Sequence, residues 1–343
     1  MSLDASRARQ ETDETAVTAA ATCADGMKKE EGKSLMGTEA PPMYEDMSAG
    51  ERTEQEIASQ PAGWRRAGLL AADVAHVLPA RGERVAVVGC GTSWFIAQAY
   101  AAAREQAGLG ETDPFTASQM PLGRRYDRVL VLSRSGTTTE ILQLLGRLRG
   151  TVPTVAITAV TQAPIGQLAD DVIDLGFVDE ESVVQTRFAT TELALLRAHL
   201  GIDPGPAADA AERVLAEPLP TDLLAARQLT FLGTGWTYGL ANEAALKLRE
   251  AAGMWTESYP AMEFRHGPMA VTGEGSVVWV FGPPPDGLDA EIAAAGGTAW
   301  FGREDPMAEL VRVHRLALAL ARARGLDPDR PRNLARSVIL APR

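Results

Sequence analysis

An internal duplication is the feature that most constrains how this chain can fold. The segment VVGCGTSWFIAQAYAAAREQAG aligns with TFLGTGWTYGLANEAALKLREAAG, so that Gly89 and Gly91 match Gly233 and Gly235 at an offset of 233 − 89 = 144 residues. A period this long excludes a solenoid and indicates two copies of one domain. Each copy begins with a short apolar run, a glycine-rich turn and a helical stretch, which is the repeating unit of a parallel sheet.

Short apolar runs alternate with helical stretches along most of the chain. We expect strands at the start of VAVVGCGTS and at 129–132, 154–158 and 172–175 in the first copy, and at the start of TFLGTG and within SVVWVFGP and TAWFG in the second. Helical patterns fill 188–199 and 207–216 between the copies, and a long one follows Pro306. The pattern predicts an α/β fold of two tandem doubly wound parallel-sheet lobes, each with three α/β/α layers. We place the first lobe at 51–200, with N-terminal helices, and the second lobe with a C-terminal tail at 201–343.

Residues 1–50 differ from the rest of the sequence. They are rich in Ala, Thr, Glu and Lys and show no sustained apolar period, which is typical of a solvated, disordered leader. Ordinary helical sequence begins only near Glu54, so Met43 or Met47 is an alternative start of the protein.

Composition narrows the class of protein. The 343 residues carry a net charge of −12 and give an isoelectric point near 5.0, which disfavours nucleic acid or an anionic membrane as a partner. Only Cys23 and Cys90 are present, so neither a disulfide framework nor a cysteine metal site is supported. No apolar run reaches the roughly eighteen residues of a membrane span. We therefore expect a cytoplasmic protein, with no metal and no cofactor.

The loop SRSGTTTE, residues 133–140, concentrates hydroxyl groups between a predicted strand and a predicted helix. Such a loop suits a phosphate, because hydroxyls donate directly, Gly136 allows close backbone approach and the helix start offers free N–H groups. A plain helix cap is the alternative, since Ser and Thr are common there. Thr92 and Ser93 end the first strand and would face the same crevice, which favours phosphate binding.

The helix of the second copy carries charges where the first copy has alanine. Glu243, Lys247 and Glu250 in NEAALKLRE share one helix face, and the positions matching the first two are Ala99 and Ala103. A solvated salt-bridge stripe is the bland alternative. In the helix that follows a βα turn, however, a carboxylate beside a lysine can act as a general base.

His266, in FRHGP, stands between Arg265 and a Gly-Pro pair and is expected in a loop. Its imidazole is suited to moving protons on and off a sugar ring oxygen, although a lone histidine is more often structural. The other three histidines, His76, His199 and His314, lie in helical runs and are interpreted as surface or packing residues.

Together these motifs resemble the sugar isomerase domain family, which includes the isomerase region of glucosamine-6-phosphate synthase, amino-sugar-phosphate deaminases and fructosamine-phosphate deglycases. GCGTS, SRSGTTTE, EAALKLRE, EFRHGP and RPRNLARSV occur in the family's order, from about Glu54 to the C-terminus. The resemblance implies a homodimer that binds a phosphorylated hexose or amino sugar in shared active sites.

The resemblance also implies roles for individual residues. The sugar phosphate would bind at Thr92, Ser93, Ser133, Arg134, Ser135 and Thr138, with Arg134 at a position where the synthase has glutamine. Glu250 would move a proton between C1 and C2, while Glu243 and Lys247 bind and polarise the substrate. His266 would open the sugar ring from the neighbouring subunit. Val183 and Gln185, in SVVQTRFAT, resemble a further sugar-contacting stretch.

Two departures limit what the resemblance implies. The chain has no glutaminase half, so this polypeptide alone cannot carry out glutamine-dependent amination. Arg336 stands where the synthase tail has an imine-forming lysine. Arginine stays protonated, so it cannot form an imine and would instead offset charge on an enolate oxygen.

We therefore expect an isomerase or deaminase that acts on a hexose phosphate of the glucosamine 6-phosphate or fructose 6-phosphate type by proton transfer between C1 and C2. Two alternatives stay open. One is a non-catalytic sugar-phosphate sensor, and the other is the isomerase subunit of a glutamine-dependent synthase divided over two chains.

Overall fold

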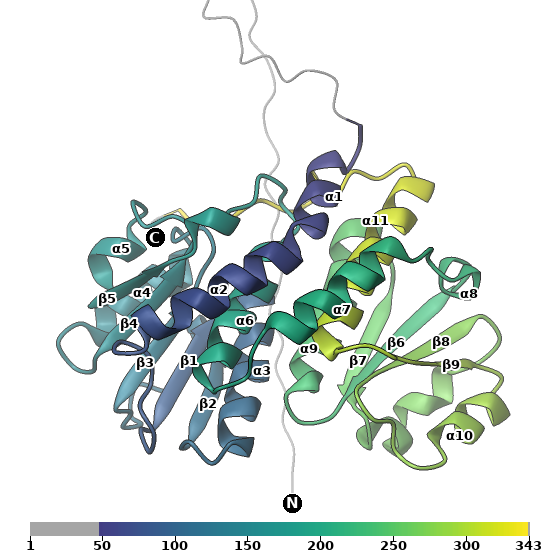
Figure 1. Cartoon of the computed structure of the whole chain (residues 1–343), viewed down its shortest axis with the longest axis horizontal. Coiled ribbons are helices and arrows are strands. Elements are labelled where there is room, and N and C mark those ends of the chain that lie inside the picture. The colour runs from purple at the N-terminus through teal and green to yellow at the C-terminus, as the bar shows by residue number, and fades with distance from the viewer. Residues whose placement is uncertain (1–47, 342–343) are drawn as a thin grey trace, which may run out of the picture. The chain divides into compact units, whose positions relative to one another are not determined.

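The computed structural model describes residues 48–341 (Figure 1). The predicted leader, with Cys23, Met43 and Met47, therefore lies outside the described residues except for its last three. The helices are α1 Glu51–Ala58, α2 Gln60–Val74, α3 Thr92–Gln106, α4 Thr139–Leu148, α5 Ile165–Leu168, α6 Arg187–His199, α7 Gly205–Ala216, α8 Thr221–Leu224, α9 Thr237–Ala252, α10 Leu288–Ala294 and α11 Pro306–Ala323. The short 3₁₀ helices are η1 Ala117–Gln119, η2 Gly176–Val178, η3 Glu263–His266 and η4 Pro268–Val271.

The strands form two separate sheets, and every pairing within them is parallel. The first sheet has the order β2-β1-β3-β4-β5, from β1 Val85–Gly89, β2 Thr112–Thr116, β3 Arg128–Leu132, β4 Thr154–Thr158 and β5 Asp171–Asp174. The second has the order β7-β6-β8-β9, from β6 Gln228–Gly233, β7 Thr256–Pro260, β8 Ser276–Phe281 and β9 Thr298–Phe301. The predicted class, two tandem parallel α/β lobes, is confirmed.

Sequence reasoning missed β2 and β7. Their sequences, TDPFT and TESYP, contain proline and polar residues, and both strands lie at a sheet edge, where proline is tolerated. They belong to the duplication, because Val85 pairs with Thr112 as Leu229 pairs with Thr256, again 144 residues apart. The repeated unit is therefore longer than the strand, turn and helix visible in the sequence.

Successive side chains of a strand point to opposite faces of the sheet, and each face packs on a different layer. Val85 and Val87 of β1 face a large core that also holds Leu229 and Phe231 of β6, so the two lobes share one interior. Ala86 and Val88 point to the opposite face of the first sheet, which α4 and α5 cover. The outer face of the second sheet packs on η3 and α10. Between the sheets, α3 packs on α9, and α6 packs on both α2 and α3 (Figure 1).

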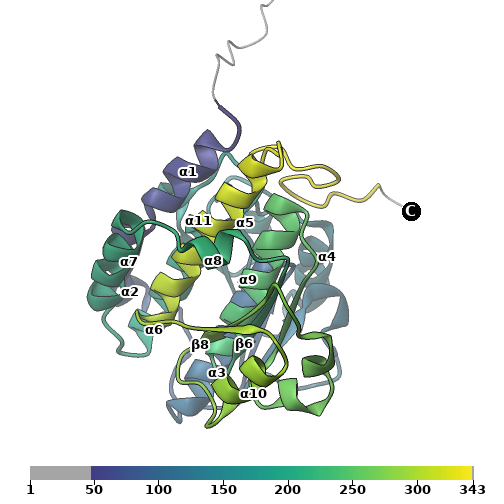
Figure 2. The same ribbon diagram turned by 90° about the vertical axis from the view of Figure 1, so that its right-hand side faces the viewer.

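The segment after α11 connects the lobes a second time. Asp329 accepts hydrogen bonds from the backbone N–H groups of Arg52 and Thr53, at 3.1 and 2.8 Å, and from the Thr53 hydroxyl at 2.6 Å. Its carbonyl accepts from the N–H of Val183 in the first lobe at 3.2 Å. Figure 2 shows α1 beside α11, where this tail begins. The tail is thereby directed across the first lobe.

Glycines set how closely backbones approach. A Cβ on Gly89 or Gly233 would lie 2.4 or 2.3 Å from the backbone of Ser93 or Thr237, in the first turn of the helix that follows each strand. A Cβ on Gly239, in α9, would lie 2.5 Å from the Phe95 carbonyl oxygen and 2.6 Å from the Ala99 nitrogen of α3. The contact between α3 and α9 therefore depends on glycine at 239. None of the described helices is long and apolar enough to cross a membrane.

We predict that Gly239→Ala destabilises the protein by about 1–3 kcal/mol, because the new methyl group forces two helix backbones apart. Gly146→Ala is the matched control, since a Cβ there meets nothing within 4 Å and alanine favours the helix by about 0.5–1 kcal/mol. Urea unfolding of both variants measures the difference. Equal stability of the two variants would contradict the close α3–α9 contact.

Candidate functional site

A cavity of about 170 Å³ opens beside the carboxyl end of β1. Its walls come from both lobes and from the tail, and are formed by Cys90, Gly91, Thr92, Thr138, Val183, Gln185, Lys247, Glu250 and residues 334–338. Seven residues predicted from the sequence line it: Thr92, Thr138, Val183, Gln185, Lys247, Glu250 and Arg336. The carboxyl edge of a parallel sheet is where doubly wound folds bind ligands.

The hydroxyl loop between β3 and α4 forms one end of the site. Gly136 turns the loop with a left-handed φ of 64°, and a Cβ there would lie 2.6 Å from Ile165. The hydroxyls of Ser135, Thr137 and Thr138 lie 3.1, 2.9 and 3.4 Å from one oxygen, the Oγ of Ser337 in the tail. The hydroxyls of this loop thus converge on a single point, as a nest for a tetrahedral anion does.

Ser337 is the residue that sequence reasoning missed. The Val338 carbonyl beside it accepts from the N–H of Thr139 at 3.1 Å, a free donor at the start of α4, and the Leu340 N–H donates to the Thr139 hydroxyl at 2.9 Å. The position of Ser337 in the sequence, directly after the predicted site residue Arg336, could have identified it as part of the site. The tail thus occupies the donors that we predict for phosphate.

The charged helix face of α9 forms the other end of the site. The Lys247 ammonium donates to the Thr92 hydroxyl at 2.9 Å, and lies 2.5 Å from Glu250 and 3.3 Å from Glu243. Thr92 in turn donates to Glu243 at 3.3 Å. The alternative of a solvated stripe is wrong, because the side chains of Lys247 and Glu243 are each 1% exposed.

Glu243 and Glu250 differ in how deeply they are buried. Burial raises the pKa of Glu243 to about 7, although the charge of Lys247 acts to lower it. Burial lowers the pKa of Lys247, but the charges of Glu243 and Glu250 outweigh it and hold the net direction upward. Glu250 keeps 20% of its side chain exposed and lines the cavity, so it is the carboxylate that a ligand can reach.

The two copies contribute different halves of this site. The hydroxyl loop follows β3, whereas its counterpart after β8 continues with Gly282 and three prolines and offers no hydroxyl. Conversely, α9 carries the charges and α3 has alanines at the first two matching positions. Thr92, at the start of α3, bonds to Glu243 and Lys247 of α9 and so joins the two halves.

Arg134 does not extend toward the hydroxyls. Its guanidinium, 1% exposed, pairs with the buried Glu180 at 3.4 Å. It also donates to the backbone carbonyls of Ser182, Val183 and Arg336 at 3.1, 3.3 and 3.1 Å. Arg134 therefore ties the tail and the 180–183 segment to the hydroxyl loop, and phosphate contact by its side chain remains only a prediction.

Several other predicted residues stand near the cavity with different roles. Arg336 lines it, but its guanidinium bonds to the Glu180 carbonyl and to Asp179. Ser93, in the first turn of α3, and Ser133, directly after β3, are buried and do not form the walls. The Gln185 carbonyl oxygen and the second oxygen of Glu243 are buried without a hydrogen-bond partner among the described residues. Of the two residues, Gln185 lines the cavity.

His266 lies in η3, exposed to solvent, and is not part of the cavity walls. His314 is buried in α11, in agreement with its interpretation as a surface or packing residue. Burial, with the nearby charge of Lys247, lowers its pKa to about 3. Across residues 48–341, no three His, Cys, Asp or Glu side chains are placed to hold a metal ion.

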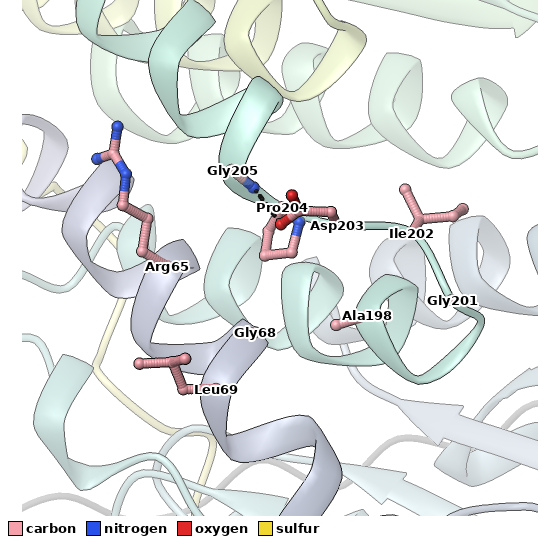
Figure 3. A pocket seen from close by; sticks show the side chains of 9 residues that line it. All are labelled: Arg65, Gly68, Leu69, Ala198, Gly201, Ile202, Asp203, Pro204 and Gly205. Atoms are coloured by element: carbon pink, nitrogen blue, oxygen red, sulfur yellow. Dashed lines mark hydrogen bonds between the residues drawn. The ribbon is translucent and has the colours of Figure 1, made fainter.

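A larger hollow of about 520 Å³ lies elsewhere, between α2 and the turn joining α6 to α7 (Figure 3). Arg65 at its rim pairs with Asp209 and Glu212, and Asp203 accepts from the N–H of Gly205 at 2.9 Å. Its charged groups are thus already paired, and its other walls are largely apolar. The smaller cavity is therefore the candidate active site.

The comparisons with known proteins agree with this fold. The profile described as SIS domain matches residues 80–199 and 222–294. Glutamine–fructose-6-phosphate aminotransferase from Sulfurisphaera tokodaii is 28% identical over 294 residues, covering 75% of this chain and 50% of that protein. The corresponding protein from Bradyrhizobium diazoefficiens is 29% identical over 316 residues, covering 75% of this chain and 52% of its own length. The chain thus spans about half the length of these relatives.

Solved structures show the same architecture. A glucosamine-6-phosphate deaminase from Thermotoga maritima superposes with a TM-score of 0.71 at 23% identity, covering 84% of this chain and all of that one. A tagatose-6-phosphate ketose/aldose isomerase from Escherichia coli gives a TM-score of 0.67 at 20% identity, covering 85% of this chain and 97% of that one. At these identities the likeness establishes the fold.

The raised pKa of Glu243 predicts a pH dependence of stability. The unfolded carboxyl titrates near 4.5 and the folded one near 7, so the stabilisation is complete below pH 4.5 and is lost as the pH rises through 7. Relative to Glu243→Gln, the wild type should lose about 3 kcal/mol of unfolding free energy between pH 4.5 and 8. Urea unfolding at both values measures it, and a constant difference would contradict the neutral form of Glu243.

Proposed function

Because this chain belongs to the SIS domain family, we propose that it is a sugar-phosphate isomerase and deaminase whose substrate is glucosamine 6-phosphate or a close relative. The supporting observation is one cavity whose walls include Thr138 of the hydroxyl loop together with Lys247 and Glu250. A sensor needs only the phosphate nest. Proton transfer also requires a base near a group that offsets charge, and Glu250 beside the buried Lys247 provides both.

In this proposal the phosphate binds at the hydroxyl loop and takes over the donors that now face Ser337. The open-chain sugar then extends toward α9, so that C1 and C2 lie beside Glu250. Glu250 removes the proton from C2 as general base, and Lys247 and Arg336 offset the negative charge that develops on oxygen. Glu243, which does not line the cavity, contributes through its bonds to Lys247 and Thr92, which do.

The reaction balances without an external oxidant. The C2 proton returns to C1 and one amine proton passes to the C1 oxygen, so that the C1 carbonyl becomes an alcohol and the C2 amine becomes an imine. C1 is thus reduced as C2 is oxidised. Water then adds to the imine, and ammonia leaves. The products are fructose 6-phosphate and ammonia.

We further propose a homodimer in which His266 opens the sugar ring in the partner's site. The support is the position of His266, which is exposed and outside the cavity of its own chain. Met262 and Val271, which flank His266, are 54% and 61% exposed, as residues that contact a partner subunit would be in a single chain.

We also propose that the protein is cytoplasmic. The proposed substrate is a phosphate anion that does not cross a bilayer unaided, which is consistent with a cytoplasmic enzyme.

Glu250→Gln should abolish formation of both ammonia and fructose 6-phosphate from glucosamine 6-phosphate, because an amide cannot accept the C2 proton. Affinity for the sugar phosphate, measured by calorimetry, should change little, because the phosphate donors are intact. Equal loss of binding and turnover would refute the role as base. Binding without either product in the wild type would instead favour the sensor, or a synthase that requires a separate glutaminase chain.

The shared site predicts complementation between two inactive variants. Unfolding and refolding an equal mixture of His266→Asn and Glu250→Gln should restore about a quarter of the wild-type activity, because half of the dimers are mixed and each has one intact site. Each variant refolded alone is the control. Absence of recovery, with mixed dimers demonstrated by differential tagging, would place His266 outside the partner's site.

A further inference from the structure

The His266 side chain makes no hydrogen bond or ion pair with any residue between 48 and 341, so its backbone alone sets its direction. A group that moves a proton must lie within about 2.6–3.2 Å of the atom that gives or takes it. A displacement of about 1 Å can cost about a hundredfold in rate. The contacts that fix the backbone around His266 therefore bear directly on its proposed role.

Three successive residues of η3 point in three different directions. A 3₁₀ helix has three residues per turn, so neighbouring side chains lie about 120° apart around its axis. Phe264 is fully buried and packs in one cluster with Leu288 and Ile292 of α10. Arg265 is bonded to α10, and His266 is exposed. The contacts of Phe264 and Arg265 thus determine where His266 points.

Arg265 is attached to α10 and to the turn before it by several hydrogen bonds. Its Nε and one terminal nitrogen donate to the two carboxylate oxygens of Glu291, at 2.7 and 3.0 Å. The same terminal nitrogen donates to the Asp286 carbonyl at 2.7 Å, and the other donates to the Met262 sulfur at 3.1 Å. A pair with two parallel bonds fixes the plane of the guanidinium as well as its distance. Arg265 therefore joins η3 to α10 in one geometry.

The chain turns sharply directly after His266. Gly267 has a φ of 133° and a ψ of −47°, a backbone conformation that residues with a side chain rarely adopt. A Cβ at Gly267 would meet nothing within 4 Å, so glycine is needed here for its conformation and not for space. Pro268 follows as the first residue of η4, with a φ that its ring fixes. The loop is thus constrained on both sides of His266.

A surface ion pair that only stabilises the fold is the alternative. The side chains of Arg265 and Glu291 are 22% and 42% exposed, and exposed pairs usually contribute little to stability. The pair between Arg213 and Glu304 is also short, at 2.5 Å, but neither residue adjoins a predicted site residue. The position of Arg265 next to His266 distinguishes it from such a pair.

We propose that Arg265 is a positioning residue for ring opening, which holds η3 on α10 so that His266 projects into the partner's site. The inference rests on the proposed function, in which His266 opens the ring of a sugar phosphate bound by the partner subunit. In that step the ring oxygen gains a proton, the C1 hydroxyl loses one, and the bond between C1 and the ring oxygen breaks to give the C1 aldehyde. Arg265 does not touch the sugar and acts through the backbone of its neighbour.

Ring opening can be measured by itself in the Glu250→Gln variant, which does not remove the C2 proton. Proton NMR exchange spectroscopy follows the interconversion of the α and β anomers of glucosamine 6-phosphate, which passes through the open chain. Adding Arg265→Gln should slow the catalysed interconversion about tenfold to a hundredfold, the cost of a displacement of about 1 Å. Affinity for the sugar phosphate, measured by calorimetry, should change little. Arg265→Lys, which can keep one bond to Glu291, should recover part of the rate.

Two further variants complete this experiment. Glu291→Ala should slow the interconversion as Arg265→Gln does, and the double variant should be no slower than either, because both changes remove the same pair. Arg213→Gln is the matched control, since it removes an exposed arginine–glutamate pair elsewhere and should leave the rate unchanged. Circular dichroism, urea unfolding and analytical ultracentrifugation check that every variant keeps its fold and its assembly.

Mixed dimers show in which site Arg265 acts. Arg265→Gln refolded with Glu250→Gln should regain about a quarter of the wild-type activity, because each mixed dimer has one site with an intact base and an intact His266 loop. Arg265→Gln refolded with His266→Asn should regain none, because both changes damage the loop that enters the partner's site. A residue that merely supports the cavity of its own chain would give the reverse pattern.

The outcomes separate this inference from the function on which it rests. If the wild type forms product but Arg265→Gln leaves ring opening unchanged, lowers affinity as much as rate, or regains activity with His266→Asn, the positioning role is wrong and the function stands. If the wild type neither forms product nor accelerates interconversion of the anomers, the proposed function fails and the positioning role fails with it.

Discussion

The site depends on one buried ammonium group. Lys247 is almost completely withdrawn from water and is stabilised by Thr92, Glu243 and Glu250 within 2.5–3.3 Å. A buried charge that loses its partners costs several kcal/mol, so this group forms only if the two lobes meet in one geometry. The glycine at 239 allows that geometry, because it lets α9 approach the backbone of α3. The packing of the two lobes and the arrangement of charges beside the cavity therefore depend on the same contact between α3 and α9.

Duplication followed by divergence explains why the cavity is asymmetric. Both copies keep the glycines of the first turn, since a side chain there would collide with the backbone of the turn. They differ at the two features that carry chemistry. The first copy keeps hydroxyls after β3 and alanines on α3, and the second has prolines after β8 and charges on α9. One composite cavity results, and the tail after α11 covers its hydroxyl loop through Ser337.

Much of this arrangement could be predicted from the sequence, and the failures have physical reasons. Apolar periodicity located the buried strands and the long helices, because burial on both faces leaves a clear pattern. It missed β2 and β7, since an edge strand needs little apolar surface and tolerates proline. The charged stripe of α9 was recognised, but its burial depends on α3, which lies 144 residues away in the alignment of the copies. Ser337 and the turning of Arg134 toward Glu180 depend on where the tail runs, which no local pattern encodes.

The most direct test of the central claim follows the C2 hydrogen itself, whatever group leaves afterwards. Glucosamine 6-phosphate carrying deuterium at C2 is incubated with the protein in ordinary water, and proton NMR follows both the C2 position and the product. If a carboxylate at the Lys247 cluster moves this proton, deuterium is lost from C2 and appears in the solvent or at C1 of fructose 6-phosphate. Full retention of deuterium at C2, with the sugar phosphate bound at saturation, would contradict a proton-transfer site and leave the cavity as a binding pocket alone.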